Sequence, residues 1–256
     1  MMMRNRTRIV VLALIGCACL IGAALAFASE TFTATTYFTP DKLGAPTNLS
    51  AKAIFASNGS VPTPVGNVLA YGPAGLEVDV VGTGICAKAT LEMDGPSGCL
   101  ADSRIGFGGG IGLVEIAKEV IKEPYTLDFF LGPKENGHLV ILVYANAVSP
   151  VSVQLVIVAK EVRGPKPYGL GFTFEIPPIP TLPGASYASI ESAHFTVGSQ
   201  KVAYYQTVHG KRKLIHVKGL IVPKTCSKGG FPFKVTINFL DGTQSTDTYT
   251  SPCPRN

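Results

Sequence analysis

Hydrophobic positions divide the chain into one long apolar run and many short alternating ones. The long run covers residues 9–28, follows three arginines within residues 4–8, and closes with Ala26-Phe27-Ala28. A basic start, an apolar stretch and two small residues around a peptidase site are typical of a secretory signal peptide, which is removed from the mature protein. We therefore expect residues 1–28 to be cleaved and the rest to fold as a secreted or cell-surface protein.

Two alternatives for this segment are open. Twenty apolar residues also suffice to span a bilayer, so the segment could stay as an uncleaved membrane anchor. Leu14-Ile15-Gly16-Cys17 resembles a lipobox, in which Cys17 would carry a lipid, but the apolar run continues for eleven residues past Cys17.

Short runs rich in Val, Ile, Phe, Tyr and Thr follow after residue 46, separated by Gly, Pro and Asn. Runs of this kind at a spacing of about 8–12 residues are typical of the strands of a sandwich or a closed sheet. Residues 29–46 are weakly patterned and predict a weakly structured lead-in. The predicted strands cover residues 76–80, 125–131, 138–144, 151–162, 168–176, 188–197, 201–208, 213–222, 231–240 and 244–250. The predicted fold of residues 47–256 is an all-β antiparallel sandwich.

Two segments allow more than one interpretation. Apolar residues within 112–123 fit helical spacing, but the context of neighbouring strands favours a strand. Residues 176–184 contain four prolines and cannot continue a ladder, because proline has no N–H to donate. This segment is either a linker between two small sandwiches or a crossover within one large sandwich.

Four cysteines lie beyond the signal sequence, and an even number in an exported chain predicts disulfides. Asp241-Gly242 predicts a two-residue hairpin turn that pairs residue 240 with residue 243. This register places Cys253 opposite Gly230, four residues from Cys226. A bridge between Cys226 and Cys253 would therefore tie the open end of the hairpin.

The other two cysteines, Cys86 and Cys99, flank a short Gly- and Pro-containing loop and are natural partners. A zinc site would need ligand pairs two to four residues apart, which this spacing lacks. We predict two disulfides and no metal site.

The charge of the mature chain is small but unevenly distributed. Without residues 1–28 the chain has 19 basic and 17 acidic residues, which does not resemble the basic footprint of a nucleic-acid-binding domain. Between residues 192 and 240, however, there is no Asp or Glu but there are eight basic residues. They are Lys201, Lys211, Arg212, Lys213, Lys218, Lys224, Lys228 and Lys234. This region is a candidate surface for an anionic envelope polymer or lipid headgroups, or else it serves solubility and strand-edge protection.

Glycine-rich and acidic patterns give weak signals for chemistry. Residues 82–87 match a loose dinucleotide-binding fingerprint, but Asp94-Gly95-Pro96 leaves no room for a useful helix after it, so we expect a bend. Residues 108–110 are three glycines and predict a flexible turn. Glu77 and Asp79 would share one face of a strand, as in paired-acid hydrolases. Val81 and Gly82 stand where a further acid would be needed, so we expect a solvated strand face instead.

Two histidines flank the sequence Gly-Lys-Arg-Lys. A hairpin with its loop at residues 211–214 would place His209 and His216 opposite each other. Two imidazoles alone do not form a tight metal site, so exposed turn residues are the simpler interpretation. No nucleophile elbow or zinc-protease motif occurs in the sequence.

Both cysteine neighbourhoods resemble motifs of uncharacterised secreted β-rich proteins of actinobacteria. The first combines Cys86, Gly95 and Cys99 with Ser103-Arg104-Ile105-Gly106, although Leu100 stands where a proline is expected. The second combines the residues around Cys226 with Phe239-Leu240-Asp241-Gly242-Thr243 and Pro252-Cys253. The resemblance implies export and β-structure and carries over no functional residues.

The sequence thus predicts an exported, non-catalytic binding or structural module of the cell envelope, with no cofactor and no nucleic-acid partner. Two other classes are open. One is a secreted hydrolase whose active site is built from dispersed loop residues. The other is a carrier of lipids or apolar small molecules in a cavity between sheets.

Overall fold

Nearly all regular structure in this protein is antiparallel β, and two disulfides stabilise it, as predicted. The structure is a computed structural model that describes residues 30–57, 61–181, 185–198 and 203–254. The predicted signal peptide lies outside these residues. No helix in the described part of the chain is long and apolar enough to cross a bilayer. The two disulfides indicate an oxidising environment.

The strands occur in the following order along the chain. They are β1 (Thr31–Thr39), β2 (Pro46–Ala56), β3 (Val65–Pro73), β4 (Glu77–Asp79), β5 (Arg104–Ile116), β6 (Glu119–Leu131), β7 (Val140–Ala147), β8 (Val153–Arg163), β9 (Tyr168–Glu175), β10 (Ser189–Val197), β11 (Ala203–Val208), β12 (Lys211–His216), β13 (Gly219–Ile221), β14 (Phe231–Phe239) and β15 (Gln244–Ser251). One helix, α1 (Lys88–Asp94), and two 3₁₀ turns, η1 (Gly95–Gly98) and η2 (Ala101–Ser103), separate β4 from β5.

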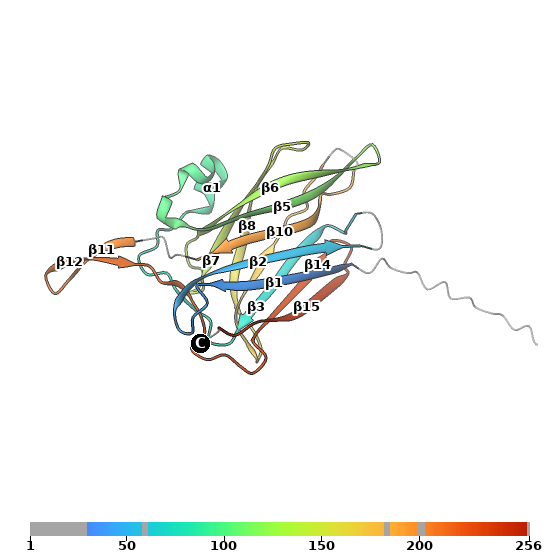
Figure 1. Cartoon of the computed structure of the whole chain (residues 1–256). Coiled ribbons are helices and arrows are strands. Elements are labelled where there is room, and N and C mark those ends of the chain that lie inside the picture. Colours follow the sequence, from blue (N-terminus) through green and yellow to red (C-terminus); the bar gives the residue numbers. More distant parts are fainter. Residues whose placement is uncertain (1–29, 58–60, 182–184, 199–202, 255–256) are drawn as a thin grey trace, which may run out of the picture.

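Thirteen of the described strands belong to one continuous sheet. Its order is β15-β14-β3-β9-β8-β7-β6-β5-β10-β2-β13-β4, and β1 pairs with the other side of β2. Strands from before and after the Pro-rich segment are interleaved, because β10 pairs with β5 and β14 pairs with β3. The sheet curls so that β1, β2, β10 and β5 cross in front of β3 and β8 (Figure 1). Two facing walls of one sheet therefore form the layers of the fold.

The two ends of the curled sheet meet at β1 and β15, which lie against each other (Figure 1). The backbone N–H of Ala34 in β1 donates a hydrogen bond of 3.0 Å to Asp247 Oδ2 in β15. A side chain thus satisfies a backbone donor on an edge strand that would otherwise face an unpaired neighbour. This contact links the two edges of the curled sheet, between which the described residues form no backbone ladder.

The prediction of a weakly structured lead-in over residues 29–46 is wrong for most of its length. Residues 31–39 form β1, whose full length pairs with β2. Threonine occupies most of its outward positions, and β-branched residues favour extended backbone. Phe32 and Phe38 are buried on the inward side. Inward and outward residues do alternate in this segment of the sequence, but the outward positions hold threonine instead of the charged residues that usually mark a solvent-facing side.

The three glycines at 108–110 are not a turn but lie inside β5. They permit close approach of neighbouring strands: a Cβ at Gly108 would lie 2.8 Å from Phe195 Cα of β10. The favoured strand assignment for residues 112–123 is confirmed. It is interrupted by a turn at Ala117 and Lys118, which both have positive φ.

Two hairpin turns differ from their predicted register. The β14–β15 turn contains three residues, because Phe239 N–H donates to the carbonyl oxygen of Thr243 at 2.9 Å. Asp241 Oδ1 accepts hydrogen bonds from the backbone and hydroxyl of Thr243, and these lower the pKa of Asp241. Gly242, with φ of +86°, completes the three-residue loop. The strand pairing is shifted by one residue from the prediction, and the Cys226–Cys253 bridge still forms.

The second shifted turn lies between β11 and β12. Its two central residues are His209 and Gly210, whose φ values of +51° and +73° fit a two-residue turn. His216 therefore pairs with Ala203 and is not opposite His209. The predicted facing pair of histidines does not exist.

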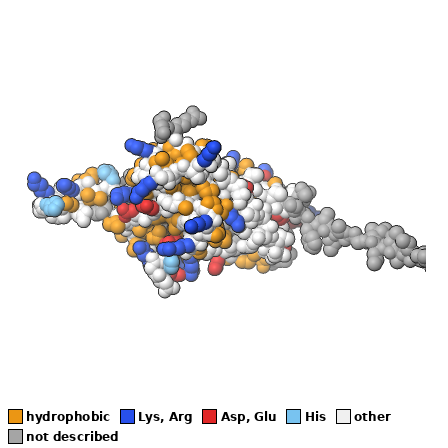
Figure 2. Space-filling model, turned by 90° about the horizontal axis from the view of Figure 1, so that it is seen from below, with side chains coloured by type: hydrophobic (Ala, Val, Ile, Leu, Met, Phe, Trp, Pro, Cys, Tyr) orange, Lys and Arg blue, Asp and Glu red, His pale blue; other side chains and the backbone are white. Residues whose placement is uncertain are grey.

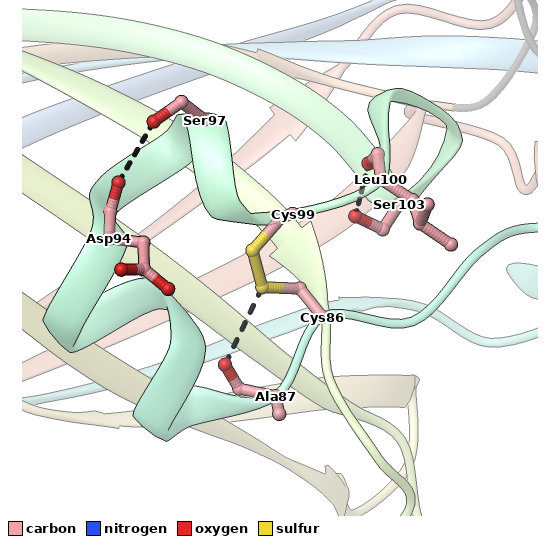
Figure 3. The surroundings of a disulfide bond; sticks show 7 residues. All are labelled: Cys86, Ala87, Asp94, Ser97, Cys99, Leu100 and Ser103. Carbon is pink, nitrogen blue, oxygen red and sulfur yellow. Dashed lines mark hydrogen bonds between the residues drawn. A yellow bond between two sulfur atoms is a disulfide. The ribbon is translucent and has the colours of Figure 1, made fainter.

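The first disulfide holds α1 against the outer surface of the sheet. Leu91 of α1 is fully buried among Phe130, Leu142 and Tyr144. Cys86 and Cys99 join the chain before and after the helix, and the hydroxyls of Ser97 and Ser103 donate to backbone carbonyls in the turns beside it (Figure 3). A short helix thus does follow the glycines at 82–84, contrary to expectation. It ends at Asp94, and Gly95 and Pro96 belong to the following turn η1. With seven residues the helix supplies packing on the sheet.

Close strand approach at β5 predicts a specific sensitivity to added volume. Gly108→Ala should lower the free energy of unfolding by about 1–3 kcal/mol, since its methyl group would overlap the backbone of β10. Gly112→Ala on the same strand is the control, because its Cβ would meet its nearest atom at 3.5 Å. Chemical denaturation of both variants tests this. Equal stability of the two would contradict the account of β5.

Candidate functional site

A cavity of about 380 Å³ lies inside the curled sheet. All eleven long strands of the sheet contribute to its lining in the described residues, and its walls are almost entirely apolar. Cavities that hold small molecules in proteins measure about 300–1,000 Å³ and are mostly apolar. The interior of this protein therefore has the size and the chemistry of a ligand site.

Small side chains at inward positions create this space. Ala34 of β1, Ala53 of β2 and Ala193 of β10 line the cavity and are directly paired across three neighbouring strands. Side chains alternate between the two faces of a strand, so these residues form one row across the inner wall. Further small residues in the lining are Ala51, Ala70, Gly112, Ala145 and Ala147. A wall of alanine and glycine cannot reach the opposite wall.

Large side chains pack near both ends of the strands, above and below the space. Phe32, Phe55 and Phe239 pack together at one end. Phe38 and Phe233 pack at the other end, where their ring centroids are 6.1 Å apart. The short strands β4 and β13 add Val78 and Leu220 to the lining. The empty region thus lies between two aromatic clusters, and residues outside the strands, such as Ile179 and Ala188, also line it.

Few polar groups face the cavity. The hydroxyl of Tyr125 donates to the carbonyl oxygen of Ser192 at 2.9 Å, and burial raises the pKa of Tyr125. Burial also raises the pKa of Tyr249 to about 12. Both phenols are neutral over the physiological pH range. Among the described lining residues one carries a carboxylate, namely Glu123, which is 4% exposed.

The predicted basic surface is divided into two parts. Lys211, Arg212 and Lys213 lie exposed on the β11–β12 hairpin, which projects from the body of the protein (Figures 1 and 2). Lys218 and Lys224 instead form ion pairs with Asp79 at 3.6 Å and Glu77 at 3.8 Å. Lys228 is exposed in the loop before β14, and Lys201 lies outside the described residues.

The acidic pair considered for hydrolysis is placed on the three-residue strand β4. Each carboxylate has a lysine partner of its own, as just described, so the pair is part of a charged surface. Within the described residues, no group of three or more His, Cys, Asp and Glu side chains is placed to hold a metal ion.

Sequence reasoning missed the residues that make the cavity. The signal was available as small residues at alternate positions, such as Ala51 and Ala53 in β2 and Ala34 in β1. A second signal was Glu123, which occupies an inward position of β6 in phase with Tyr125, Leu127, Phe129 and Leu131. Alanine alternation is hard to recognise as a strand signal, because alanine favours helices and is depleted in strands.

Comparison with known proteins gives no relative: no family model, no curated protein and no solved structure matches this chain. The interpretation of the cavity therefore rests on its own geometry.

The empty space predicts that one inward alanine can be enlarged. Ala193→Leu should leave the free energy of unfolding unchanged or raise it, because the new side chain enters the cavity. Ala159→Leu should lower it by about 1–3 kcal/mol, because Ala159 is also inward but fully buried in close packing. Thermal and urea unfolding of both variants measure the difference. Similar destabilisation of the two would argue against free space beside Ala193.

Proposed function

We propose that this protein binds and carries one lipid or apolar small molecule inside its curled sheet. The observation that supports this function is the cavity of about 380 Å³ with almost purely hydrocarbon walls. Water in such a site would lack the two to four polar partners that an ordered buried water needs. An apolar ligand would instead gain contacts with every wall.

The carrier function accounts for the alanine row better than a purely structural role does. Protein interiors are close-packed, and leaving a space of this size unfilled costs stability. Larger inward residues at Ala34, Ala53 and Ala193 would remove that cost. Their small size is expected if a ligand completes the packing.

Export is part of the proposal. Residues 1–28 would direct the chain through the general secretion route, and the disulfides fit an oxidising destination. A carrier in the cell envelope would move an apolar molecule through water between two surfaces.

An apolar fluorescent probe tests the site. N-phenyl-1-naphthylamine should bind the wild-type protein with enhanced fluorescence, and Ala193→Leu should weaken binding because it occupies the same space. Thr35→Leu is the matched control, since it adds a leucine at an exposed outward position of β1. The proposal fails if the wild-type protein does not bind the probe, or if both leucine variants bind it equally well.

The β11–β12 hairpin supports a second function, attachment to an anionic lipid surface. It forms a sheet of two strands that is separate from the main sheet, and such hairpins alone are only marginally stable in water. Tyr205 and Leu214 are direct cross-strand partners that are 60% and 49% exposed. The guanidinium of Arg212 lies 4.1 Å from the centre of the Tyr205 ring.

This combination fits a membrane surface in particular. Arg212 shares one face of the hairpin with the two exposed apolar side chains, and Lys211 and Lys213 alternate to its other face. No acidic residue occurs between residues 192 and 240. Anionic headgroups attract cations near the surface by about 1 kcal/mol each, and the Tyr205–Leu214 pair would contact the interfacial region. The cations gather toward the free end of the hairpin, away from the sheet (Figure 2).

Vesicle sedimentation tests the attachment. The protein should bind vesicles that contain phosphatidylglycerol and not those of phosphatidylcholine alone, and binding should weaken as salt rises. Lys211→Gln with Lys213→Gln should reduce binding roughly 30-fold, at about 1 kcal/mol per charge. Lys218→Gln with Lys224→Gln removes the same charge from paired lysines and should have little effect. Salt-independent binding, or equal loss in both double variants, would refute attachment through the hairpin.

A further inference from the structure

One inward position of β6 carries a carboxylate in the otherwise apolar interior. Glu123 precedes Tyr125, Leu127 and Phe129 at alternate positions, and all four line the cavity. The neighbouring Lys122 faces the other side of the sheet, where it forms an ion pair with Glu191. The alternation of the strand therefore directs Glu123 inward.

The protein satisfies this carboxylate only in part. Glu123 Oε1 accepts one hydrogen bond of 3.3 Å from the backbone N–H of Val151. No lysine, arginine or histidine among the described residues forms an ion pair with it. The nearby hydroxyl of Tyr125 is already used, because it donates to Ser192. A buried carboxylate with so few partners is costly unless another group pairs with it.

Space for such a group lies beside Glu123. Its direct partner on β5 is Gly112, which has no side chain and also lines the cavity. A Cβ at Gly112 would make only ordinary contacts, the nearest at 3.5 Å. The carboxylate therefore lies on the cavity wall beside a position that has no side chain of its own.

We propose that Glu123 binds the polar head of the carried molecule and that this head is a positively charged amine. The inference deepens the proposed carrier function and rests on it: the apolar tail lies along the alanine row, and the ammonium donates to Glu123. A charged hydrogen bond in a site of low polarity is stronger than the same contact in water. An alcohol head would donate a weaker hydrogen bond, and a carboxylate head would be repelled.

Competition for the naphthylamine probe tests this inference. Dodecylamine, dodecanol and dodecanoate share one tail length and are used below their critical micelle concentrations. The wild-type protein should bind dodecylamine about tenfold more tightly than dodecanol, as expected for a hydrogen bond to a charged group, and dodecanoate most weakly. Glu123→Gln should remove the preference for the amine over the alcohol, because glutamine carries no charge to attract the ammonium.

Two further variants complete the test. Glu119→Gln removes an exposed carboxylate from the same strand and should keep the preference for the amine. Glu123→Asp keeps the charge and should retain part of the preference. Probe binding without any preference among the three heads, or a preference that survives Glu123→Gln, would overturn the role of Glu123 but not the carrier function. Failure of the wild-type protein to bind the probe would overturn both.

Discussion

The closure of one wide sheet on itself determines the rest of this structure. The width of a closed sheet grows with its number of strands, and about eight strands already enclose an interior that side chains can just fill. In the described residues, eleven long strands surround the interior here, and β1 meets β15 through the hydrogen bond from Ala34 to Asp247. Because several inward positions carry alanine or glycine, the side chains leave a central space.

The same closure explains why the outer parts of the fold are arranged as they are. Once both ends of the sheet are joined, the outer face still exposes apolar side chains on β6 and β7, and α1 covers them with Leu91. The disulfide between Cys86 and Cys99 holds this cover in place, and the bridge between Cys226 and Cys253 fixes the chain ends of the β14–β15 hairpin. Both bridges lie outside the cavity and stabilise the closed sheet without entering it.

The sequence predicted the strands and disulfides well because local signals determine them. Turn residues and β-branched runs marked most strands between residues 125 and 250, and the spacing of the four cysteines led to the right pairs. Register and closure depend instead on contacts between distant segments. The one-residue shift at Gly242 follows from the hydrogen bonds of Asp241 with Thr243, and the pairing of residues 108–110 with β10 is invisible in a local window. The sequence left a carrier with an internal cavity open as one class, but it did not identify the cavity residues, since Ala34, Ala53 and Ala193 come side by side only through long-range strand pairing.

The central claim is that the closed sheet holds one apolar molecule. Native mass spectrometry of the mature protein, before and after incubation with a total lipid extract, tests it most directly. The account predicts a complex of one protein with one bound molecule, which dissociates to the mass of the polypeptide under denaturing conditions and does not form with Ala193→Leu. A spectrum that contains only the polypeptide mass under both conditions would contradict it.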